Sequence, residues 1–217
     1  MKGLGLLLAG LLGLAACGSD PAGIDDLGLI KQVIVQKLAA RGKAAAPAPI
    51  SRAELDAIGL PLIRVKVLKR SAVAVLGLVG TNNGVQTWTS VDSLTIGLRD
   101  GMVLATRGFG DDLISATVPL ASEIAHGSGQ VEHRLFTLEG ADREIRRIVA
   151  CSLTTTGTEV IEVVQLRYSA RHVIETCAGE GLRFQNQYWF ENSGNLRQSV
   201  QWISAEVGYL EIQDANR

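Results

Sequence analysis

Acidic side chains between expected strands are the first residues in this chain whose type and spacing could do chemistry. Glycoside hydrolysis uses two carboxyl groups about 5–10 Å apart. Adjacent side chains on a strand point to opposite faces, so Asp111 and Asp112 would act together only if a turn rotated them. A carbohydrate-active enzyme with loop carboxylates therefore stays an alternative, and turn or helix-cap roles compete with it. The candidates are Asp92, Asp100, Asp111, Asp112 and Glu123.

Motifs for other common chemistries are incomplete. Ser128 has a glycine on each side but lacks the Gly-x-Ser-x-Gly pattern of a nucleophile elbow. Gly108-Phe109-Gly110 lacks the third glycine of a dinucleotide-binding loop, and the two carboxylates that follow it would repel phosphate. We therefore expect no catalytic residue, no metal site and no cofactor. The three histidines are far apart and form no metal-binding motif: His126, His133 and His172.

The N-terminus resembles a bacterial export signal. Residues 1–16 contain one lysine, an apolar run of about a dozen residues and a small-residue exit, which predicts a secretory signal peptide. Leu14-Ala15-Ala16-Cys17 looks like a lipobox, which implies cleavage before Cys17 and acylation of it; two or more acyl chains anchor firmly. Gly18, not Asp, follows, a pattern that implies the periplasmic face of the outer membrane. An ordinary secretory signal with a chance cysteine is the alternative.

Cys151 and Cys177 are the cysteines that remain after the expected processing. The export signal implies an oxidising compartment, where an even number of cysteines favours a disulfide. In the chain-entropy model a bridge across a loop of this length contributes about 3.5 kcal/mol. Two buried free thiols are the alternative. A metal pair is disfavoured, because the spacing shows neither Cys-x-x-Cys nor a histidine at ligand spacing.

Composition narrows the class of protein. Of the 217 residues, 47% are hydrophobic, too many for a disordered polymer. Lys and Arg number 21 against 22 Asp and Glu, a balance that argues against nucleic-acid binding by bulk electrostatics. The one long apolar stretch lies at the extreme N-terminus, which excludes a multi-span helical membrane protein.

The segment between the signal and the main domain divides into a tether and a helical part. Residues 17–23 are a short tether, and residues 24–60 form a helical segment with an Ala/Pro linker over 43–50. Ser51 and Glu54 form a capping box that predicts a short helix over 52–58. A longer helix over about 25–42 is predicted by apolar residues at helical spacing, which are Leu27, Ile30, Ile34 and Leu38.

From residue 61 to 217, short β-rich runs alternate with turn signals roughly every ten residues. This pattern predicts a mainly β fold, an antiparallel barrel-like or sandwich domain with one or two accessory N-terminal helices. Asn83-Gly84 and Asp100-Gly101 predict hairpin turns, and Thr155-Thr156-Gly157 predicts another, followed by a new strand at Glu159. The expected strands are 62–68, 72–79, 85–91, 94–98, 102–106, 131–138, 143–152, 159–168, 171–177, 182–191, 196–203 and 207–212.

Aromatic residues are few and cluster in the expected strands. Tryptophan and tyrosine combine a large apolar ring with a polar handle, which suits them to binding surfaces. Trp88, Tyr188 and Trp202, together with Asp112, are therefore candidates for contact with a glycan or a protein partner. Packing in the core is the competing interpretation for the aromatic residues.

Three stretches in this order resemble the YjbF/GfcB family of outer-membrane lipoproteins, and the resemblance covers most of the mature chain. They are the lipobox ending at Cys17; the stretch Thr87-Trp88-Thr89-Ser90-x-Asp92, Arg99-Asp100-Gly101 and Arg107-Gly108-x-Gly110-x-Asp112-Leu113; and the hairpin from Tyr188-Trp189-Phe190 to Gln201-Trp202.

The resemblance implies a barrel-like antiparallel domain and a role in secretion of exopolysaccharide or group 4-type capsule, with no established catalytic residues. It favours a non-enzymatic accessory factor that binds polysaccharide or another protein of the secretion system. A lipid or lipoprotein carrier is a further alternative, because a barrel can enclose an apolar ligand.

The stretch around Asp112 also has an interpretation that needs no family. Gly108 and Gly110 allow the chain to leave a strand sharply. Asp112 would then accept backbone N–H groups at the start of a helical turn, with Leu113 and Ile114 packing beneath it. This structural role competes with a sugar site at Asp112.

Overall fold

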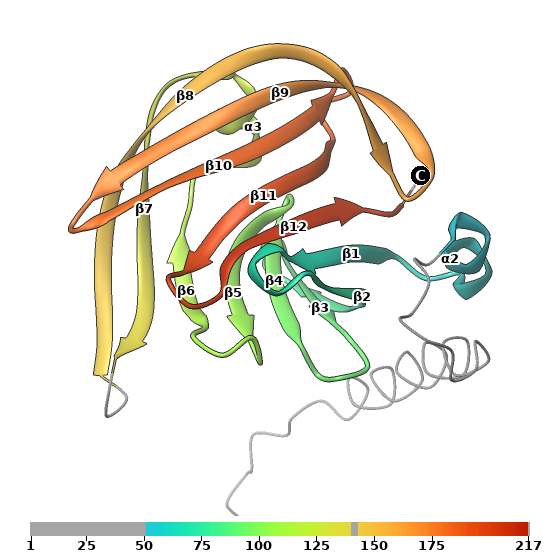
Figure 1. The fold of residues 1–217 in the computed structure, drawn as a ribbon, viewed down its shortest axis with the longest axis horizontal. Coiled ribbons are helices and arrows are strands. Elements are labelled where there is room, and N and C mark those ends of the chain that lie inside the picture. The colour runs from blue at the N-terminus through green and yellow to red at the C-terminus, as the bar shows by residue number, and fades with distance from the viewer. Residues whose placement is uncertain (1–50, 140–142, 217) are drawn as a thin grey trace, which may run out of the picture.

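Within the described residues, twelve strands form one antiparallel sheet that curls into a nearly closed barrel (Figure 1). The structure is a computed structural model that describes residues 51–139 and 143–216. It confirms the barrel-like antiparallel prediction. The strands are β1 (Leu62–Val67), β2 (Ala72–Asn82), β3 (Val85–Thr89), β4 (Thr95–Arg99), β5 (Met102–Arg107), β6 (Leu113–Thr117), β7 (Ser128–Glu139), β8 (Arg143–Val163), β9 (Leu166–Gly179), β10 (Leu182–Glu191), β11 (Leu196–Ser204) and β12 (Gly208–Asp214).

Several predictions about the N-terminus fall outside the described residues. These are the signal peptide over 1–16, acylation of Cys17, the tether over 17–23 and the longer helix over about 25–42. They stay predictions.

The strand order explains how the sheet closes. Along the sheet it runs β5-β4-β3-β2-β1-β12-β11-β10-β9-β8-β7-β6. Strands that are adjacent in the sheet are also consecutive in the chain, with one exception. The exception is the pair of β1 and β12, which joins the two ends of the described domain. Strands β5 and β6, consecutive in the chain, therefore become the two edges of the sheet and face each other across a seam.

Side chains from β5 bridge this seam. The guanidinium of Arg107 donates to the carbonyl oxygens of Leu113 (3.2 Å) and Ile114 (3.1 Å) on β6. The Leu113 N–H donates to the Thr106 hydroxyl oxygen at 3.0 Å. These bonds satisfy backbone groups that an open sheet edge would expose, and they hold the barrel closed without a regular ladder.

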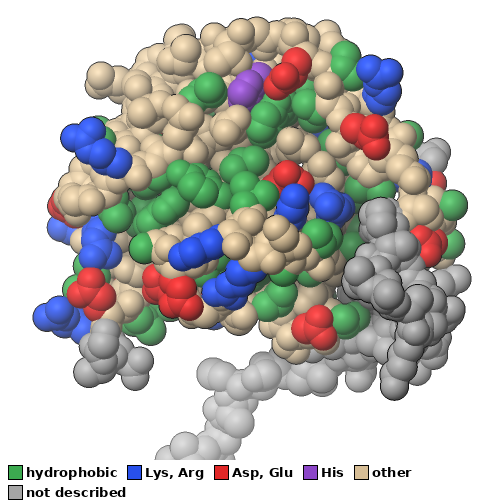
Figure 2. Space-filling view, viewed as in Figure 1, with side chains coloured by type: hydrophobic (Ala, Val, Ile, Leu, Met, Phe, Trp, Pro, Cys, Tyr) green, Lys and Arg blue, Asp and Glu red, His purple; other side chains and the backbone are tan. Residues whose placement is uncertain are grey.

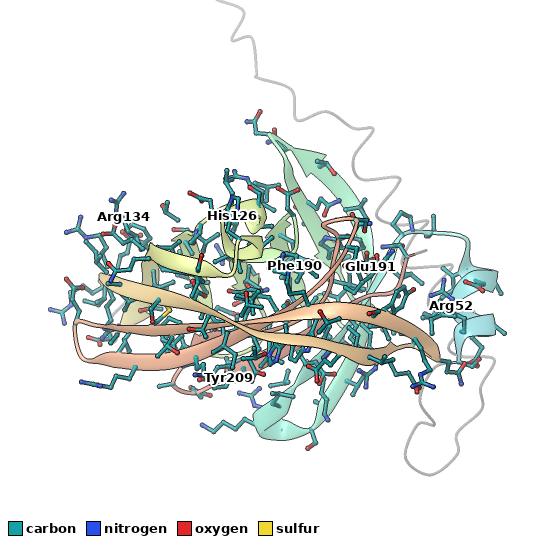
Figure 3. All side chains as sticks on the ribbon, turned by 90° about the horizontal axis from the view of Figure 1, so that it is seen from above. Arg52, His126, Arg134, Phe190, Glu191 and Tyr209 are labelled. Atoms are coloured by element: carbon teal, nitrogen blue, oxygen red, sulfur yellow. A yellow bond between two sulfur atoms is a disulfide. The ribbon has the colours of Figure 1, made fainter. Side chains whose placement is uncertain are left out.

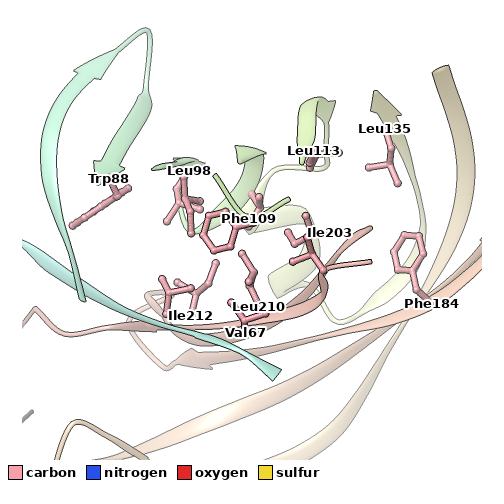
Figure 4. Packing of buried hydrophobic residues seen from close by; sticks show 14 of the residues in the cluster. Val67, Trp88, Leu98, Phe109, Leu113, Leu135, Phe184, Ile203, Leu210 and Ile212 are labelled. Carbon is pink, nitrogen blue, oxygen red and sulfur yellow. The ribbon is translucent and has the colours of Figure 1, made fainter. Parts of the chain in front are cut away.

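The core lies inside the barrel because alternate residues of each strand point inward. Val65, Leu76, Ile96, Ile203 and Leu210 are at most 1% exposed and belong to one cluster. Figure 4 shows Phe109, from the β5–β6 loop, beside Leu210 in this cluster. Burial of each such side chain stabilises the fold by roughly 1.5–3 kcal/mol.

The short helix predicted over 52–58 is confirmed as α2 (Arg52–Ile58), with its capping box. The Ser51 hydroxyl oxygen accepts from the Glu54 N–H at 3.3 Å, and a Glu54 carboxylate oxygen accepts from the Ser51 N–H at 2.7 Å. Leu55 and Ile58 on its inner face join a second cluster with Val163 at the far end of β8.

Helix α3 (Ala121–Ala125) was not predicted from the sequence. Ile124 is its fully buried residue and packs in a third cluster with Met102 and Tyr188. Glu123 fixes the start of the helix, because its carboxylate accepts from the Leu120 N–H at 2.7 Å. None of the described helices is long and apolar enough to cross a membrane.

The predicted turn at Thr155–Gly157 is wrong. Strand β8 is 21 residues long and continues through this point. The register shifts between Thr155 and Gly157, so a bulge lies here, with Gly157 at φ 137°. The chain reverses instead at Val164 (φ 44°) and Gln165 (φ 66°). Positive φ is disfavoured for a β-branched residue such as valine, so the sequence gave no indication of a turn at Val164. Val164 is buried in the α2 cluster, which offsets the strain.

The helical turn predicted after Asp112 is also wrong, because Leu113–Thr117 is strand β6. The Asp112 carboxylate caps the turn that precedes it. It accepts from the N–H groups of Gly108 (2.8 Å) and Phe109 (3.2 Å) and from the Thr106 hydroxyl (2.8 Å). Asp112 therefore shapes the β5–β6 loop at the seam.

Candidate functional site

A cavity of about 800 Å³ lies at the end of the barrel that carries α3 and the β4–β5 and β10–β11 turns. The inner faces of β1 to β4, β11 and β12 contribute the rest of its wall. It is lined by Pro61, Ile63, Leu78, Gln86, Trp88, Leu98, Asp100, Gly101, Leu120, Ala121, Ser122, Ala125, His126, Gly194, Asn195, Leu196, Arg197, Ser199, Ile212, Asp214 and Asn216.

One part of this wall is apolar and another part is polar. Ile63, Leu78, Trp88, Leu98 and Ile212 form the apolar part, on adjacent strands of the sheet. Leu78 and Trp88 are direct cross-strand partners. The polar part combines side chains from β3 and β11 with turn and C-terminal residues, namely Gln86, Asp100, Asn195, Ser199, Asp214 and Asn216.

Trp88 contributes a polar group without a protein partner. The side chain is only 3% exposed, yet the indole Nε1 finds no acceptor among the described residues. Leaving a buried donor unpaired costs about 1–3 kcal/mol. Trp88 was a sequence candidate for ligand contact, and the structure places it in the wall of the cavity, on the inner face of the barrel.

Arg197 is the one Lys or Arg among the described residues that line the cavity, and acidic groups hold it. Its Nε donates to Glu191 at 2.8 Å, and its Nη1 donates to Asp214 at 3.1 Å. Burial lowers the pKa of Arg197, but Glu191 and Asp214 outweigh this and raise it. Asp100 adds a second lining carboxylate, so the lining holds two carboxylates, one guanidinium and the imidazole of His126.

Tyr188 was a second candidate for ligand contact, but it is fully buried in the barrel. Its hydroxyl donates to Glu175 at 2.9 Å, and Asn186 donates to the same carboxylate oxygen at 2.8 Å. The other oxygen contacts His133 Nε2 at 2.6 Å. Burial alone would raise the pKa of Glu175, but the His133 hydrogen bond and charge, with Asn186 and Tyr188, lower it. Burial and the Glu175 charge raise the Tyr188 pKa.

The predicted disulfide is present beside this network. Cys151 on β8 and Cys177 on β9 are direct cross-strand partners with an S–S distance of 2.00 Å. Their sulfurs and the side-chain ligand atoms of His133 and Glu175 all lie within 4.8 Å of one another. A site of two cysteines, one histidine and one glutamate binds zinc only when both cysteines are thiolates. Because Cys151 and Cys177 are bonded to each other, His133 and Glu175 are the two ligands of this set that remain. The structure thus brings a histidine to the cysteine pair, which sequence spacing did not reveal.

Trp202 on β11 is half-buried and stacks on Phe184, a member of the main core cluster, with ring centroids 4.8 Å apart. Hydrophobic side chains gather over β10 and β11 on the face of the molecule that Figure 2 shows. Figure 3 shows Tyr209 and His126 on opposite sides of the long ribbons that cross the middle of the view. The Tyr209 hydroxyl accepts from the Gln185 N–H at 3.3 Å. Trp88 lines the cavity and Trp202 does not, so the two tryptophans form no common site.

Comparison with known proteins decides the family. The model of the family "Group 4 capsule polysaccharide lipoprotein gfcB, YjbF" matches residues 31–214. The chain belongs to this family. The uncharacterized lipoprotein YjbF of Escherichia coli (strain K12) is 23% identical over 133 residues, which are 59% of this chain and 63% of that protein, so the match spans less than two thirds of the relative.

A solved structure shows the same fold. The crystal structure of the hypothetical lipoprotein YmcC from Escherichia coli (K12) superposes with a TM-score of 0.68 at 15% identity, covering 77% of this chain and 89% of that one. The family resemblance inferred from the sequence is confirmed. The protein is thus a member of a family of capsule-related lipoproteins with a β-barrel fold.

The candidate carboxylates of this YjbF-family barrel are dispersed. Asp100 lines the cavity, whereas Asp92 and Asp112 do not, and Asp112 caps the β5–β6 loop. Sequence reasoning missed Asp214, which joins Asp100 in the lining and is paired with Arg197. Its signal was weak, because Arg197 on β11 and Asp214 on β12 are 17 residues apart and meet only once these two strands pair.

Proposed function

We propose that this YjbF-family protein is a lipid-anchored accessory factor on the periplasmic face of the outer membrane. It acts in secretion of exopolysaccharide or group 4-type capsule, and it binds the polysaccharide without cutting it. The cavity at the α3 end of the barrel, with Trp88 in its wall, carries this proposal. Family membership supports the link to capsule, and the Cys17 lipobox supports the anchor.

The arrangement of acids favours binding over cleavage. Glycoside hydrolysis needs one carboxyl group that gives a proton and a second that attacks or activates water. Among the described residues that line the cavity, the carboxylates are Asp100 and Asp214, and Asp214 is paired with Arg197 at 3.1 Å. The other oxygen of Asp214 accepts from the backbone N–H (3.0 Å) and the side-chain amide (2.6 Å) of Asn216. Hydrogen bonds within the protein therefore engage both oxygens of this carboxylate, which suits neither task well.

A deletion strain tests the proposed role. We expect less polymer outside the cell, polymer of unchanged length retained inside, and recovery when the intact gene is returned. Cys17→Ser, which removes the acylation site, should not restore secretion and should shift the protein out of the outer-membrane fraction. Unchanged secretion in the deletion strain would refute the role, and full rescue by Cys17→Ser would refute the anchor.

The enzyme alternative has one structural argument, the position of Asp100 in the cavity lining. Incubation of the purified full chain with the native polymer decides it. Our proposal expects the polymer to keep its length. Shortened chains that persist with wild type and disappear with Asp100→Asn would establish hydrolysis in its place.

A further inference from the structure

We infer that reduction of the Cys151–Cys177 bridge converts its surroundings into a Zn²⁺ site. The ligands are the two thiolates, His133 Nε2 and one carboxylate oxygen of Glu175. None of these residues lines the cavity at the α3 end of the barrel, so the inference goes beyond the proposed function and does not depend on it.

Three neighbouring strands bring the four ligands to one patch of the inner wall. Cys151 on β8 and Cys177 on β9 are cross-strand partners, and Glu175 lies two residues before Cys177 on the same face of β9. His133 on β7 lies diagonally across from Cys151, whose direct partner on that strand is Val131. The four side chains are buried, and their ligand atoms all lie within 4.8 Å of one another. One ion can therefore contact all four.

The types and the number of these ligands match zinc. Zn²⁺ in proteins takes thiolate sulfur at about 2.3 Å and imidazole nitrogen or carboxylate oxygen at about 2.0–2.2 Å, and structural sites hold four such ligands in a tetrahedron. Two sulfurs on one such ion lie roughly 3.8 Å apart, which rotation of the two cysteine side chains allows once the bond between them is broken. Because all four ligands are buried, the site is a closed, structural one.

Glu175 is already oriented as a metal ligand. Its Oε2 accepts from the Asn186 amide at 2.8 Å and from the Tyr188 hydroxyl at 2.9 Å, whereas its Oε1 contacts His133 Nε2 at 2.6 Å. Outer hydrogen bonds of this kind hold the ligands of a metal in place. A Zn²⁺ ion inserted between Oε1 and Nε2 takes one ligand from each residue and leaves the bonds to Oε2 intact.

The exchange of bridge for metal balances in electrons, protons and charge. A dithiol reductant gives two electrons and two protons to the bridge, so that two thiols form and the reductant becomes a disulfide. Zn²⁺ then displaces the two thiol protons and any second imidazole proton, and His133 binds it as a neutral imidazole with its proton on Nδ1. The neutral bridge is thus replaced by one Zn²⁺ ion and two thiolates, whose charges cancel.

Bridge and metal compete for the same two sulfurs, and each cross-links the wall of the barrel. The bridge joins β8 to β9. The metal joins the same two strands and also ties β7 to them through His133. The reduced protein therefore keeps a cross-link at this point when Zn²⁺ is present.

Metal titration of the reduced full-length protein tests the inference. The bridge is reduced with excess dithiothreitol, which is removed under nitrogen, and Co²⁺ is added as a spectroscopic probe, followed by Zn²⁺. We expect one equivalent of Co²⁺ to bind with the intense visible absorption of tetrahedral thiolate coordination, and Zn²⁺ to displace it. Absence of this absorption from the reduced protein, or its appearance in the unreduced protein, would overturn the inference.

Variants separate the contributions of the ligands. Cys151→Ser/Cys177→Ser keeps His133 and Glu175 but should lose the Co²⁺ absorption. His133→Gln keeps a hydrogen-bond donor beside Glu175 and removes the nitrogen ligand, so we expect Co²⁺ to bind at least about tenfold more weakly, the loss that removing even an outer hydrogen-bond partner causes. His126→Gln, a histidine outside the set, is the matched control and should bind as reduced wild type does. Equal affinities of reduced wild type and His133→Gln would overturn the four-ligand site.

Stability measurements keep the inference testable whether or not the reduced protein stays folded. If it unfolds, Zn²⁺ should restore the far-ultraviolet circular dichroism of the barrel in wild type but not in Cys151→Ser/Cys177→Ser. If it stays folded, Zn²⁺ should raise its melting temperature and leave that of the unreduced protein unchanged. Failure of the applicable result would overturn the site and leave the role in secretion, which the deletion strain tests, standing.

Discussion

Glu175 shows how a single residue organises the barrel interior. Its carboxylate is fully enclosed, and hydrogen bonds from Asn186 and Tyr188 and a contact with His133 occupy both oxygens. A buried charge is tolerated only when it is paired and hydrogen-bonded in this way. The three partners come from β7 and β10, so Glu175 on β9 joins three strands through one carboxylate.

Glu175→Gln should lower the free energy of unfolding near neutral pH by roughly 2–4 kcal/mol, because it removes a charge that buried donors surround. The folded-state pKa of Glu175 lies below its usual value of 4.5. Its contribution is therefore fully present above the unfolded-state pKa and is lost as the pH falls through the lower folded-state pKa.

Urea unfolding at about pH 7 and about pH 3 measures this effect. The stability difference between wild type and Glu175→Gln should shrink on acidification. Glu132→Gln, an exposed residue on β7 that pairs with Arg134, is the matched control and should change stability little at either pH. A wild-type advantage that stays constant with pH would contradict the account.

At the residue scale the sequence predicted some roles and missed others. The disulfide followed from the export signal and an even cysteine count, and the structure contains it. The buried network was not predictable, because Glu175, His133 and Tyr188 look like ordinary polar residues of strands until the strands are placed side by side. The same holds for Asp214, whose partner Arg197 lies on a neighbouring strand.

The seam between β5 and β6 is the element on which closure of the barrel depends. Thr106 and Arg107 reach across it from β5, and Asp112 fixes the loop that connects the two strands. These side chains take the place of a regular strand ladder. Removing one of them should therefore lower the free energy of unfolding more than an average surface substitution on a strand does.

Asp112→Ala should lower the free energy of unfolding by roughly 1–2 kcal/mol, because it removes acceptors for Gly108, Phe109 and Thr106. Asp111→Ala, at the neighbouring position, is the control and should have a smaller effect. Oligosaccharide binding should persist in both variants, since neither residue lines the cavity. Loss of binding in folded Asp112→Ala would instead support the sugar site that the sequence left open there.

The β8–β9 hairpin depends on the disulfide in a measurable way. The bridge closes a separation of 26 residues, so its removal should cost about 3.5 kcal/mol in the chain-entropy model. Denaturant unfolding of Cys151→Ser/Cys177→Ser against wild type measures this loss. Alkylation of the unreduced, denatured wild type should modify neither cysteine, and modification of both would contradict the pairing.

At the element scale, local signals predicted most hairpins and α2, since turn glycines and a capping box act over a few residues. The sequence missed β6 and α3, which are five residues each. Thr106 and Arg107 on β5 hold β6, and α3 packs through Ile124 against Met102 and Tyr188, so the partners of both elements lie outside their own segments. The misplaced β8–β9 turn has the same cause, because Val164 adopts its conformation in contact with the α2 cluster.

The whole molecule is a barrel because its first and last described strands pair. Strand β1 meets β12 in regular register, so Ile63 and Asp214 lie opposite each other and both line the cavity. Alternation of residue types could predict an antiparallel sheet but not this long-range pairing. The cavity exists only as a consequence of closure, which explains why the sequence could nominate Trp88 and not the site around it.

Size-exclusion chromatography of the native exopolysaccharide with the full-length protein in nanodiscs tests the central claim most directly, that this barrel binds the polymer and does not cut it. We predict that protein co-elutes with the polymer, that the polymer elutes at the same volume after prolonged incubation, and that Ser122→Trp, which puts a bulky ring into the cavity lining, abolishes co-elution. Separate elution of protein and polymer, or a shift of the polymer to shorter chains, would contradict the account.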